Sequence, residues 1–551
     1  MKIDRRTALG LIGFGAATPA ASQPAGGGVS FRHGVASGDP LQDRVVLWTR
    51  LTPQQPGGQI AYRWALNPVG RRAGGAKRGT GVTGPDRDYT AKVDVAGLDP
   101  GQAYTFTFEA GGVTSPLGRT RTLPTGPTRD AVIAVASCSL YPQGYFNAYQ
   151  ALADLPRLDL VLHMGDYIYE YGGPGTYGMD SAVAAERPHD PPHEILSLAD
   201  YRRRHAQYKS DPNLQAAHAR AAGIVAWDVH ETTNDSFSAG AQNHQPDTEG
   251  DWTARKAIAL KAYYEWMPIR DPAPGQSMSE AAARSFRIGD LAQIIMLETR
   301  LTARDKQLTY DDDLTHVDGK PDFVAFQTKL HDPARRIIGP TQEAWLAAEL
   351  AGSVKAGHAW QLIGTGVFMG RVIIPDPARD FPPEGLAAMD EAGRNRMRRW
   401  GALAGQPYGL DMWDGYPVDR ERVYDLVKQA DARPIVVSGD SHAFWANELH
   451  DASGRRVACE FGGTSITSSG GGDAIKSFDI GAVFAKVSPE VVFNDQASKG
   501  FVLLTLTRSA ARGDMVAVST IVSKTFTTRT VKRFEVRPEG TGLSGLKEIP
   551  V

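Results

Sequence analysis

The sequence predicts an α/β protein in which an antiparallel β-sandwich precedes a larger domain of layered sheets and helices. Two observations carry this prediction. Between residues 28 and 126, short alternating segments such as RVVLWTRL and AYTFTFEAGG fit half-buried strands. After residue 130, fully apolar runs alternate with helical stretches, which is typical of sheets that are covered on both faces.

The first element is an expected export signal over residues 1–23. A charged start, a Gly/Ala-rich apolar segment and a small-residue end are typical of such signals. The pair Arg5 and Arg6 favours export by the twin-arginine machinery, and a general-secretion signal is the alternative. We expect cleavage between Ala17 and Gln23 and a periplasmic or secreted mature protein.

The second element, residues 28–126, is the expected β-sandwich domain. Within it, VAGLDPGQAYTF places a Leu, a Pro-Gly turn and then a Tyr at the start of the next strand. That order resembles the tyrosine corner of immunoglobulin or fibronectin-type sandwiches. The following TLPTGPTRD indicates a linker.

The third element is the layered domain, residues 130–540. Each of its apolar runs ends in polar residues, and each predicts a buried strand. The runs are AVIAVASCS, LDLVLHMGD, GIVAWDVHE, LAQIIMLETR, AWQLIGTGV and RPIVVSGDSH. Helices are expected at DYRRRHAQYKSDPNLQAAHARAA and GPTQEAWLAAELAGS, and antiparallel strands from about residue 499 close the domain.

Composition excludes several classes of partner. The 551 residues carry a formal charge of −2, so the chain lacks the excess of basic residues that would indicate nucleic-acid-specific binding. No central stretch has the roughly 20 apolar residues that a transmembrane segment needs. The only cysteines, Cys138 and Cys459, leave a single disulfide as one interpretation.

Three polar insertions are expected to be surface loops or lids with solvated charges: AQNHQPDTEGDW, TYDDDLTHVDGKPD and PDPARDFPPEGLAAMDEAGRNRMRRW.

Chemically active side chains stand at the ends of four of the predicted strands. They are Cys138, Asp166, Asp228 with His230, and Asp440 with His442. Ligand sites of layered α/β folds lie outside the carboxyl ends of the strands. We therefore expect these four ends to form one site.

Each of these motifs suits metal or phosphate chemistry. In HMGDYIYEYG, Asp166 can bridge two cations, and the phenolate of Tyr169 favours a hard cation such as ferric iron. In AWDVHETTND, His230 can hold a phosphoryl oxygen or protonate a leaving group, and Asn234 can add to a calcium-like shell. Taken singly, each motif is also compatible with a structural role.

Two other routes to hydrolysis lack their sequence signals. No GxSxG nucleophile elbow stands at a strand end, and no GxxxxGK[ST] phosphate loop is present. The serine-rich GGTSITSSGGG has no neighbouring base and is interpreted as a close-packed loop. Hydrolysis by metal-activated water is therefore favoured over a covalent serine route.

In combination and order, these motifs resemble the PhoD-like alkaline phosphatase family within the metallophosphoesterase group. The resemblance covers nearly the whole chain. It rests on the twin-arginine start, FRHGVASGDPLQDRVVLWTRLTP, ASCS, HMGDYIYEYG, WDVHE, NHQPDTEGDW, YYEWMPIR, LETRL, LDMWDGYP and SGDSH.

The resemblance implies a β-sandwich before an α/β/β/α metallophosphatase domain that hydrolyses phosphodiesters and phosphomonoesters with Fe³⁺ and Ca²⁺. It implies that four residues bind iron: Cys138, Asp166, Tyr169 and His442. Asp166 would bridge to calcium, with Asp440 and Asn234 in that second shell. His230 and Asp166 would take the catalytic roles, with His230 contacting the phosphate.

One position departs from the family pattern. The family usually has Trp-Asp-Asp-His-Glu, whereas this chain has Val229 between Asp228 and His230. Valine supplies no oxygen ligand, so the calcium site is the one in question, and Asp228 is a candidate replacement. Two alternatives to a general phosphoesterase remain open: a phospholipase D-like enzyme acting on lipid phosphodiesters and, because of Val229, a degenerate phosphate-binding homologue.

Overall fold

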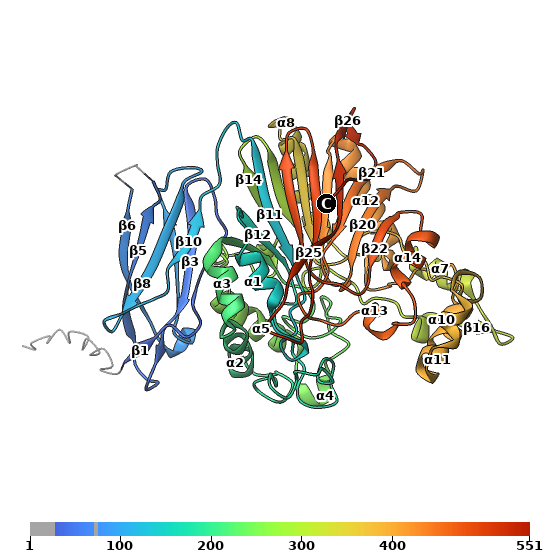
Figure 1. The fold of residues 1–551 in the computed structure, drawn as a ribbon, viewed down its shortest axis with the longest axis horizontal. Coiled ribbons are helices and arrows are strands. Elements are labelled where there is room, and N and C mark those ends of the chain that lie inside the picture. Colours follow the sequence, from blue (N-terminus) through green and yellow to red (C-terminus); the bar gives the residue numbers. More distant parts are fainter. Residues whose placement is uncertain (1–27, 71–74) are drawn as a thin grey trace, which may run out of the picture.

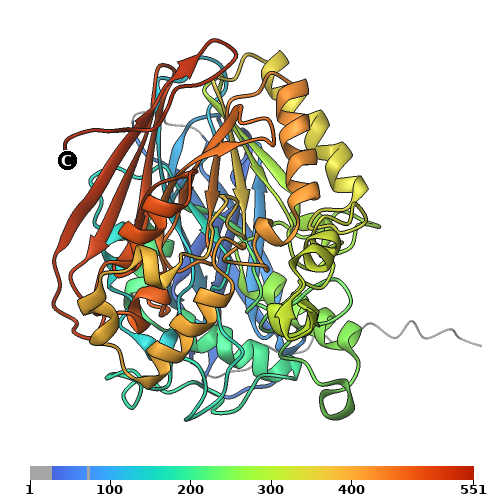
Figure 2. The same ribbon diagram turned by 90° about the vertical axis from the view of Figure 1, so that its right-hand side faces the viewer.

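The protein forms two large sheets that pack face to face, with helices on both outer faces and a smaller sheet at the N-terminal end (Figures 1 and 2). The computed structural model describes residues 28–70 and 75–551. The expected export signal, residues 1–23, lies outside the described residues. The layers agree with the α/β/β/α arrangement expected for the larger domain.

The N-terminal sandwich has one sheet of its own. Its strand order is β10-β8-β5-β6, with β9 on β8. The bounds are β5 Ile60–Pro68, β6 Lys77–Thr83, β8 Ala103–Ala110, β9 Val113–Thr114 and β10 Gly118–Arg121. The backbone N–H of Asp99 donates to the hydroxyl of Tyr104 at 3.0 Å, so the expected tyrosine corner is confirmed.

The opposing layer of the sandwich belongs to the large ten-stranded sheet, which the sequence did not predict. It contains β2 Val35–Gly38, β3 Arg44–Arg50 and β7 Thr90–Ala96. Gly38 of β2 pairs with Gly223 of β13, and this pairing joins the strands of the sandwich to the central strands of the large sheet. A Cβ at Gly38 would lie 2.1 Å from the carbonyl oxygen of Pro268, so only glycine allows this close approach.

The ten-stranded sheet has the order β28-β25-β24-β23-β11-β12-β13-β2-β3-β7. Its parallel centre is β11 Asp130–Ala136, β12 Leu160–Met164 and β13 Ala222–Ala226. The expected closing strands are confirmed as β23 Lys499–Thr507, β24 Ala511–Val518, β25 Thr528–Val536 and β28 Lys547–Glu548.

Helices cover the outer face of this sheet. They are α1 Asn147–Ala153, α2 Leu198–Lys209, α3 Pro212–Arg220 and α5 Trp252–Trp266. The sequence suggested a continuous helical stretch where α2 and α3 lie. The chain breaks there because Asp211 caps α3 by accepting the N–H groups of Asn213 and Leu214, and Pro212 then starts the new helix.

The second sheet has the order β14-β15-β18-β19-β21-β20-β22. The bounds are β14 Arg284–Ile288, β15 Ala292–Met296, β18 Trp360–Thr365, β19 Pro434–Ser438, β20 Phe444–His450, β21 Arg456–Gly462 and β22 Val491–Asp495. Helices α8 Pro340–Lys355 and α12 Pro417–Gln429 cover its outer face. The main core lies between the sheets and takes apolar residues from both, for example Leu162 and Leu362.

Short helices and hairpins lie at the end of the molecule opposite the sandwich (Figure 1). They include α7 Phe323–Leu330, α9 Pro377–Asp380, α10 Pro383–Ala387, α11 Glu391–Ala402, α14 Ile480–Val487 and the hairpin of β16 His316–Val317 with β17 Lys320–Pro321. The remaining short elements are α4 Pro246–Glu249, α6 Tyr310–Asp313, α13 Gly471–Ala474, β1 Val29–Ser30, β4 Thr52–Pro53, β26 Pro538–Glu539 and β27 Gly542–Leu543. Within the described chain, no helix is long and apolar enough to cross a membrane.

Candidate metal centre

The ends of four strands meet, as the sequence predicts. Strands β11, β12, β13 and β19 lead to Cys138, Asp166, Asp228 and Asp440. Ligand atoms of Cys138, Asp166 and His442 lie within 4.8 Å of one another, and we call this set the first cluster. Those of Asp166, Asp228 and Asp440 also lie within 4.8 Å of one another and form the second cluster. Asp166 belongs to both, which is the position that a bridging carboxylate needs.

The backbone at these strand ends is unusual. Cys138, Asp166, Asp440 and His442 have φ angles of 60°, 53°, 62° and 57°. They make up four of the ten nonglycine residues with positive φ in the described chain. Left-handed conformations are costly for residues with a Cβ, and they concentrate at functional sites. The fold therefore holds these four side chains at the cost of backbone strain.

Tyr169 extends the first cluster. Its buried hydroxyl donates to Oδ2 of Asp166 at 3.2 Å and lies 3.5 Å from Nε2 of His442. Burial, and then the charge of Asp166, raise the pKa of both the Cys138 thiol and the Tyr169 phenol. A bound cation would reverse this effect by stabilising thiolate and phenolate. Sulfur, phenol, carboxylate and imidazole thus form a donor set that fits a transition metal.

The serine-rich loop orients two of these donors. Ser468 Oγ donates to the carbonyl of Cys138 at 2.9 Å and lies 2.7 Å from the Tyr169 hydroxyl. The carbonyl of Ser469 lies 2.7 Å from Nδ1 of His442. This contact makes Nδ1 the protonated nitrogen and leaves Nε2 as a lone-pair donor. The loop is close-packed, as expected, but it also supports the candidate ligands, which sequence analysis missed.

A positively charged side chain, Arg300, lies against the second cluster. This buried side chain follows β15 and binds both carboxylate oxygens of Asp228, at 2.6 and 2.9 Å. Its Nη2 also lies 3.3 Å from Oδ2 of Asp440, which accepts no hydrogen bond from any described residue. Burial would lower the pKa of Arg300, but Asp228 and Asp440 raise it far more. The guanidinium therefore offsets part of the negative charge of this cluster.

Two further positions of the AWDVHETTND segment, Val229 and Asn234, make hydrogen bonds to residues outside the second cluster. Val229 is buried but belongs to none of the hydrophobic clusters of the described residues. Its carbonyl accepts the N–H of Thr232 at 3.0 Å. The amide of Asn234 donates to Gln242 at 3.0 Å, and its backbone N–H donates to Glu170. These contacts do not join Asn234 to the cluster, so its role as a ligand stays a prediction.

His230 packs beside the first cluster. Its ring stacks on Tyr169 with centroids 4.1 Å apart, and its backbone N–H donates to Oδ1 of Asp166 at 3.1 Å. Nδ1 lies 2.7 Å from Oε2 of Glu170. Burial would lower the pKa of His230, but the carboxylates of Asp166 and Glu170 outweigh burial and raise it to about 10. Because Glu170 engages Nδ1, Nε2 is the ring nitrogen left for another partner.

Two glutamates that sequence analysis did not assign brace the site. Glu170 accepts from Thr233, Asn234 and Asn243 in addition to His230. The buried carboxylate of Glu231 accepts the backbone N–H groups of Asp166, Tyr167 and Asp228, at 3.1, 2.7 and 2.8 Å. Glu231 thereby ties the ends of β12 and β13 together.

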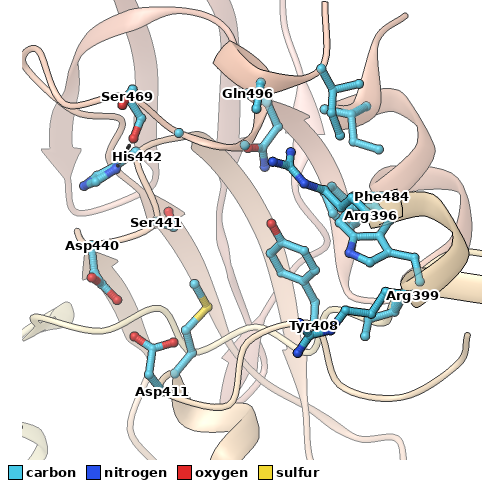
Figure 3. Close-up of a pocket in the computed structure, with 18 of the residues that line it drawn as sticks. Arg396, Arg399, Tyr408, Asp411, Asp440, Ser441, His442, Ser469, Phe484 and Gln496 are labelled. Carbon is cyan, nitrogen blue, oxygen red and sulfur yellow. Dashed lines mark hydrogen bonds between the residues drawn. The ribbon is translucent and has the colours of Figure 1, made fainter. Parts of the chain in front are cut away.

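A cavity of about 750 Å³ opens beside the clusters. Asp440 and His442 lie on one side of it (Figure 3). Arg396 and Arg399 of α11 and Phe484 of α14 lie on the other, with Tyr408 between (Figure 3). The insertion that contains α11 was expected to be a surface loop or a lid, and it contributes a wall of this cavity.

The two cysteines are not paired. Cys138 and Cys459 are both buried and free, so the disulfide interpretation is wrong. His163, near the end of β12, is hydrogen-bonded through Nε2 to the hydroxyl of Tyr149 at 2.7 Å.

Comparison with known proteins identifies the family. Residues 133–515 match the model of the PhoD-like phosphatase family, and residues 16–124 match that of the PhoD-like phosphatase N-terminal domain. The chain is 34% identical over 528 residues to alkaline phosphatase D of Bacillus subtilis (strain 168). The matched region covers 93% of this chain and 82% of that protein. A solved structure of PhoD matches with a TM-score of 0.76 and 31% identity, over 94% of this chain and 92% of the other. The chain belongs to the PhoD-like phosphatase family and is a phosphoric ester hydrolase.

Proposed function

We propose that this phosphoric ester hydrolase is a two-metal enzyme that cleaves phosphodiesters and phosphomonoesters. The observation that carries the proposal is the convergence of four strand ends on two ligand clusters that share Asp166. The match over the catalytic domain and the retained donor set do not favour a degenerate binding protein. The match to an alkaline phosphatase also does not favour a lipid-specific enzyme.

Ferric iron is the proposed occupant of the first cluster. A thiolate from Cys138, a phenolate from Tyr169, Asp166 and Nε2 of His442 would hold it. Phenolate and carboxylate oxygens favour a hard, strongly acidic cation. A thiolate and a phenolate on ferric iron would also give the protein a visible colour.

Calcium is the proposed occupant of the second cluster. Asp166, Asp228 and Asp440 offer carboxylate oxygens, which calcium prefers, and Asn234 is the further candidate ligand. The second cluster fits less completely than the first, because Arg300 already engages Asp228 and because Val229 adds no oxygen. We propose that Asp228 takes the ligand position that Val229 cannot fill.

When bound, the two cations would polarise the phosphoryl oxygens and lower the pKa of an attacking water. The chain positions the other reacting groups. His230, protonated and fixed by Glu170, would donate a hydrogen bond from Nε2 to a phosphoryl oxygen or a proton to the leaving alcohol. Glu231 would keep Asp166 and Asp228 in place through their backbone N–H groups.

The place of action is proposed from the N-terminal sequence. Arg5 and Arg6 ahead of a weakly apolar segment support export by the twin-arginine machinery, which transports folded proteins. Export in the folded state would allow a metal to be inserted first. We therefore propose a periplasmic or secreted enzyme.

Leaving-group kinetics of the metal-loaded enzyme test the role of His230. We expect His230→Gln to lower kcat by about 100-fold or more on an alkyl ester, whose leaving alcohol needs a proton, and less on a p-nitrophenyl ester. His450→Gln, on β20, is the matched control and should change neither rate. Equal losses on both esters would argue for a phosphate-binding rather than a proton-donating His230, and no hydrolysis of any ester by the wild type would refute the proposed function.

A further inference from the structure

The cavity beside the clusters has two chemically different ends. One end contains Asp440 and His442, where the reacting phosphoryl group would lie. The other contains Arg396 and Arg399 of α11 (Figure 3). A volume of about 750 Å³ exceeds what one phosphate group fills and is within the range of pockets for whole small molecules. The arginine end is therefore available to a part of the substrate that does not react.

The two arginines differ in their partners. Arg399 pairs with Asp311 at 2.6 Å, so it already has a carboxylate partner. Arg396 forms no ion pair with any carboxylate among residues 28–70 and 75–551. It faces the cavity together with Gln496 and Tyr408, which are polar but uncharged. A cation with no paired carboxylate on a cavity wall is suited to an anion on the ligand.

An aromatic wall lies next to Arg396. Tyr408 packs against Phe484 with ring centroids 4.8 Å apart and against Trp400 at 5.7 Å. All three residues line the cavity. Such a wall binds flat or apolar groups, and the nearby guanidinium binds a charged one. The combination favours a substrate with an organic group between two anionic groups.

We propose that Arg396 is a specificity-determining residue that binds a second anionic group of a phosphodiester substrate. The reacting phosphoryl group lies at Asp440 and His442, the organic group packs on the aromatic wall, and the second phosphate pairs with Arg396. The inference rests on the proposed function, because that function places the reacting group. It assigns Arg396 a role in substrate choice and none in bond cleavage.

The test compares two diesters that differ by one phosphate: the p-nitrophenyl ester of thymidine 5′-phosphate, and the same ester with a 3′-phosphate. Initial rates of p-nitrophenolate release are measured with metal-loaded full-length enzyme. The wild type should prefer the 3′-phosphorylated ester by about ten-fold in kcat/KM, since a charge-assisted contact has roughly that value. Arg396→Gln should abolish this preference through KM, and Arg396→Lys should retain part of it.

Arg398→Gln is the matched control. It removes an arginine from the same helix, but Arg398 does not line the cavity and contacts Asn395 instead. This variant should keep the wild-type preference. Equal rates of the wild type on both esters, or an unchanged preference in Arg396→Gln, would overturn the inference.

A binding measurement separates this inference from the proposed function. Calorimetry compares thymidine 3′,5′-bisphosphate with thymidine 5′-phosphate on wild type and Arg396→Gln. If the wild type releases no p-nitrophenolate from either ester, the proposed function fails, while binding still tests Arg396. Tighter binding of the bisphosphate that disappears in Arg396→Gln supports the inference, and equal binding of both nucleotides refutes it.

Discussion

The two clusters share Asp166 but differ in whether the protein itself supplies a positive charge to them. In the first, the buried Cys138 and Tyr169 have raised pKa values, so without a cation they remain neutral. In the second, Arg300 brings a permanent positive charge to Asp228 and Asp440. The first cluster therefore needs an external cation to become ionised, whereas the second is partly compensated by the protein.

This difference indicates how each cluster would depend on a bound metal ion. Deprotonating Cys138 and Tyr169 in a buried site is favourable only when a cation is bound, so metal binding there is coupled to release of protons. Asp228 already has a charged partner, so the proposed calcium ion would have to compete with Arg300 for these carboxylates or share them. We expect tight binding at the first cluster and weaker, exchangeable binding at the second.

The largest effect is expected at the residue that the clusters share. Asp166→Asn removes the charge of the carboxylate that both clusters share and should lower kcat by more than about a thousand-fold. Elemental analysis of the purified variant should show loss of both metals. If one metal remained at the wild-type content, the clusters would not share Asp166 as a ligand.

Arg300→Gln tests whether Arg300 balances the negative charge of the second cluster. It leaves Asp228 and Asp440 buried without their cation and should lower the free energy of unfolding by about 3 kcal/mol. Added Ca²⁺ should restore much of this loss, because a cation could then bind the freed carboxylates. Denaturant titrations with a chelator and with Ca²⁺ measure both effects.

The control for Arg300→Gln is a buried ion pair elsewhere. Arg420 pairs with Asp414 at 2.6 Å, and both side chains are buried. Arg420→Gln should also destabilise the protein, but Ca²⁺ should not rescue it. Equal rescue of the two variants would mean that the effect of Ca²⁺ is unrelated to the second cluster.

Cys138→Ser tests the first cluster. Serine retains the shape of cysteine but is a poor ligand for a transition metal, so iron content and any visible absorption should fall, with a loss of about 100-fold in kcat. Cys459→Ser is a matched control, since Cys459 is also buried and free. An unchanged absorption spectrum in Cys138→Ser would remove the thiolate from the proposed ligand set.

The fold and the shared site were predictable because they depend on local patterns. Apolar runs followed by polar residues mark buried strands and their carboxyl ends, and parallel strands bring those ends together. This reasoning placed Cys138, Asp166, Asp228 and Asp440 in one site, as the structure shows. It also predicted the closing strands after residue 499.

The supporting residues were not predictable, because their roles arise from contacts between distant segments. Arg300 follows β15 and reaches Asp228, 72 positions away in the sequence. Ser469 orients His442 from a loop that contains no sequence motif for a metal site. Gly38, which joins the sandwich to the central sheet, has to be glycine because the carbonyl of Pro268 lies so close to it. Such residues have ordinary local patterns, and only tertiary packing gives them a function.

Val229→Asp is the smallest expected effect and addresses the one departure from the family pattern. Because Val229 is buried, a carboxylate there would need a bound cation to offset the loss of its hydration. We expect it to tighten binding of Ca²⁺ by about ten-fold, as one added carboxylate ligand should, with a similar or smaller rise in activity at limiting Ca²⁺. Val229→Asn, which adds an uncharged oxygen, should give a smaller gain. Calcium titrations of activity and of bound metal measure both variants. If Val229→Asp instead lowered both quantities, Asp228 and Arg300 would define a second site that differs in construction from the family pattern.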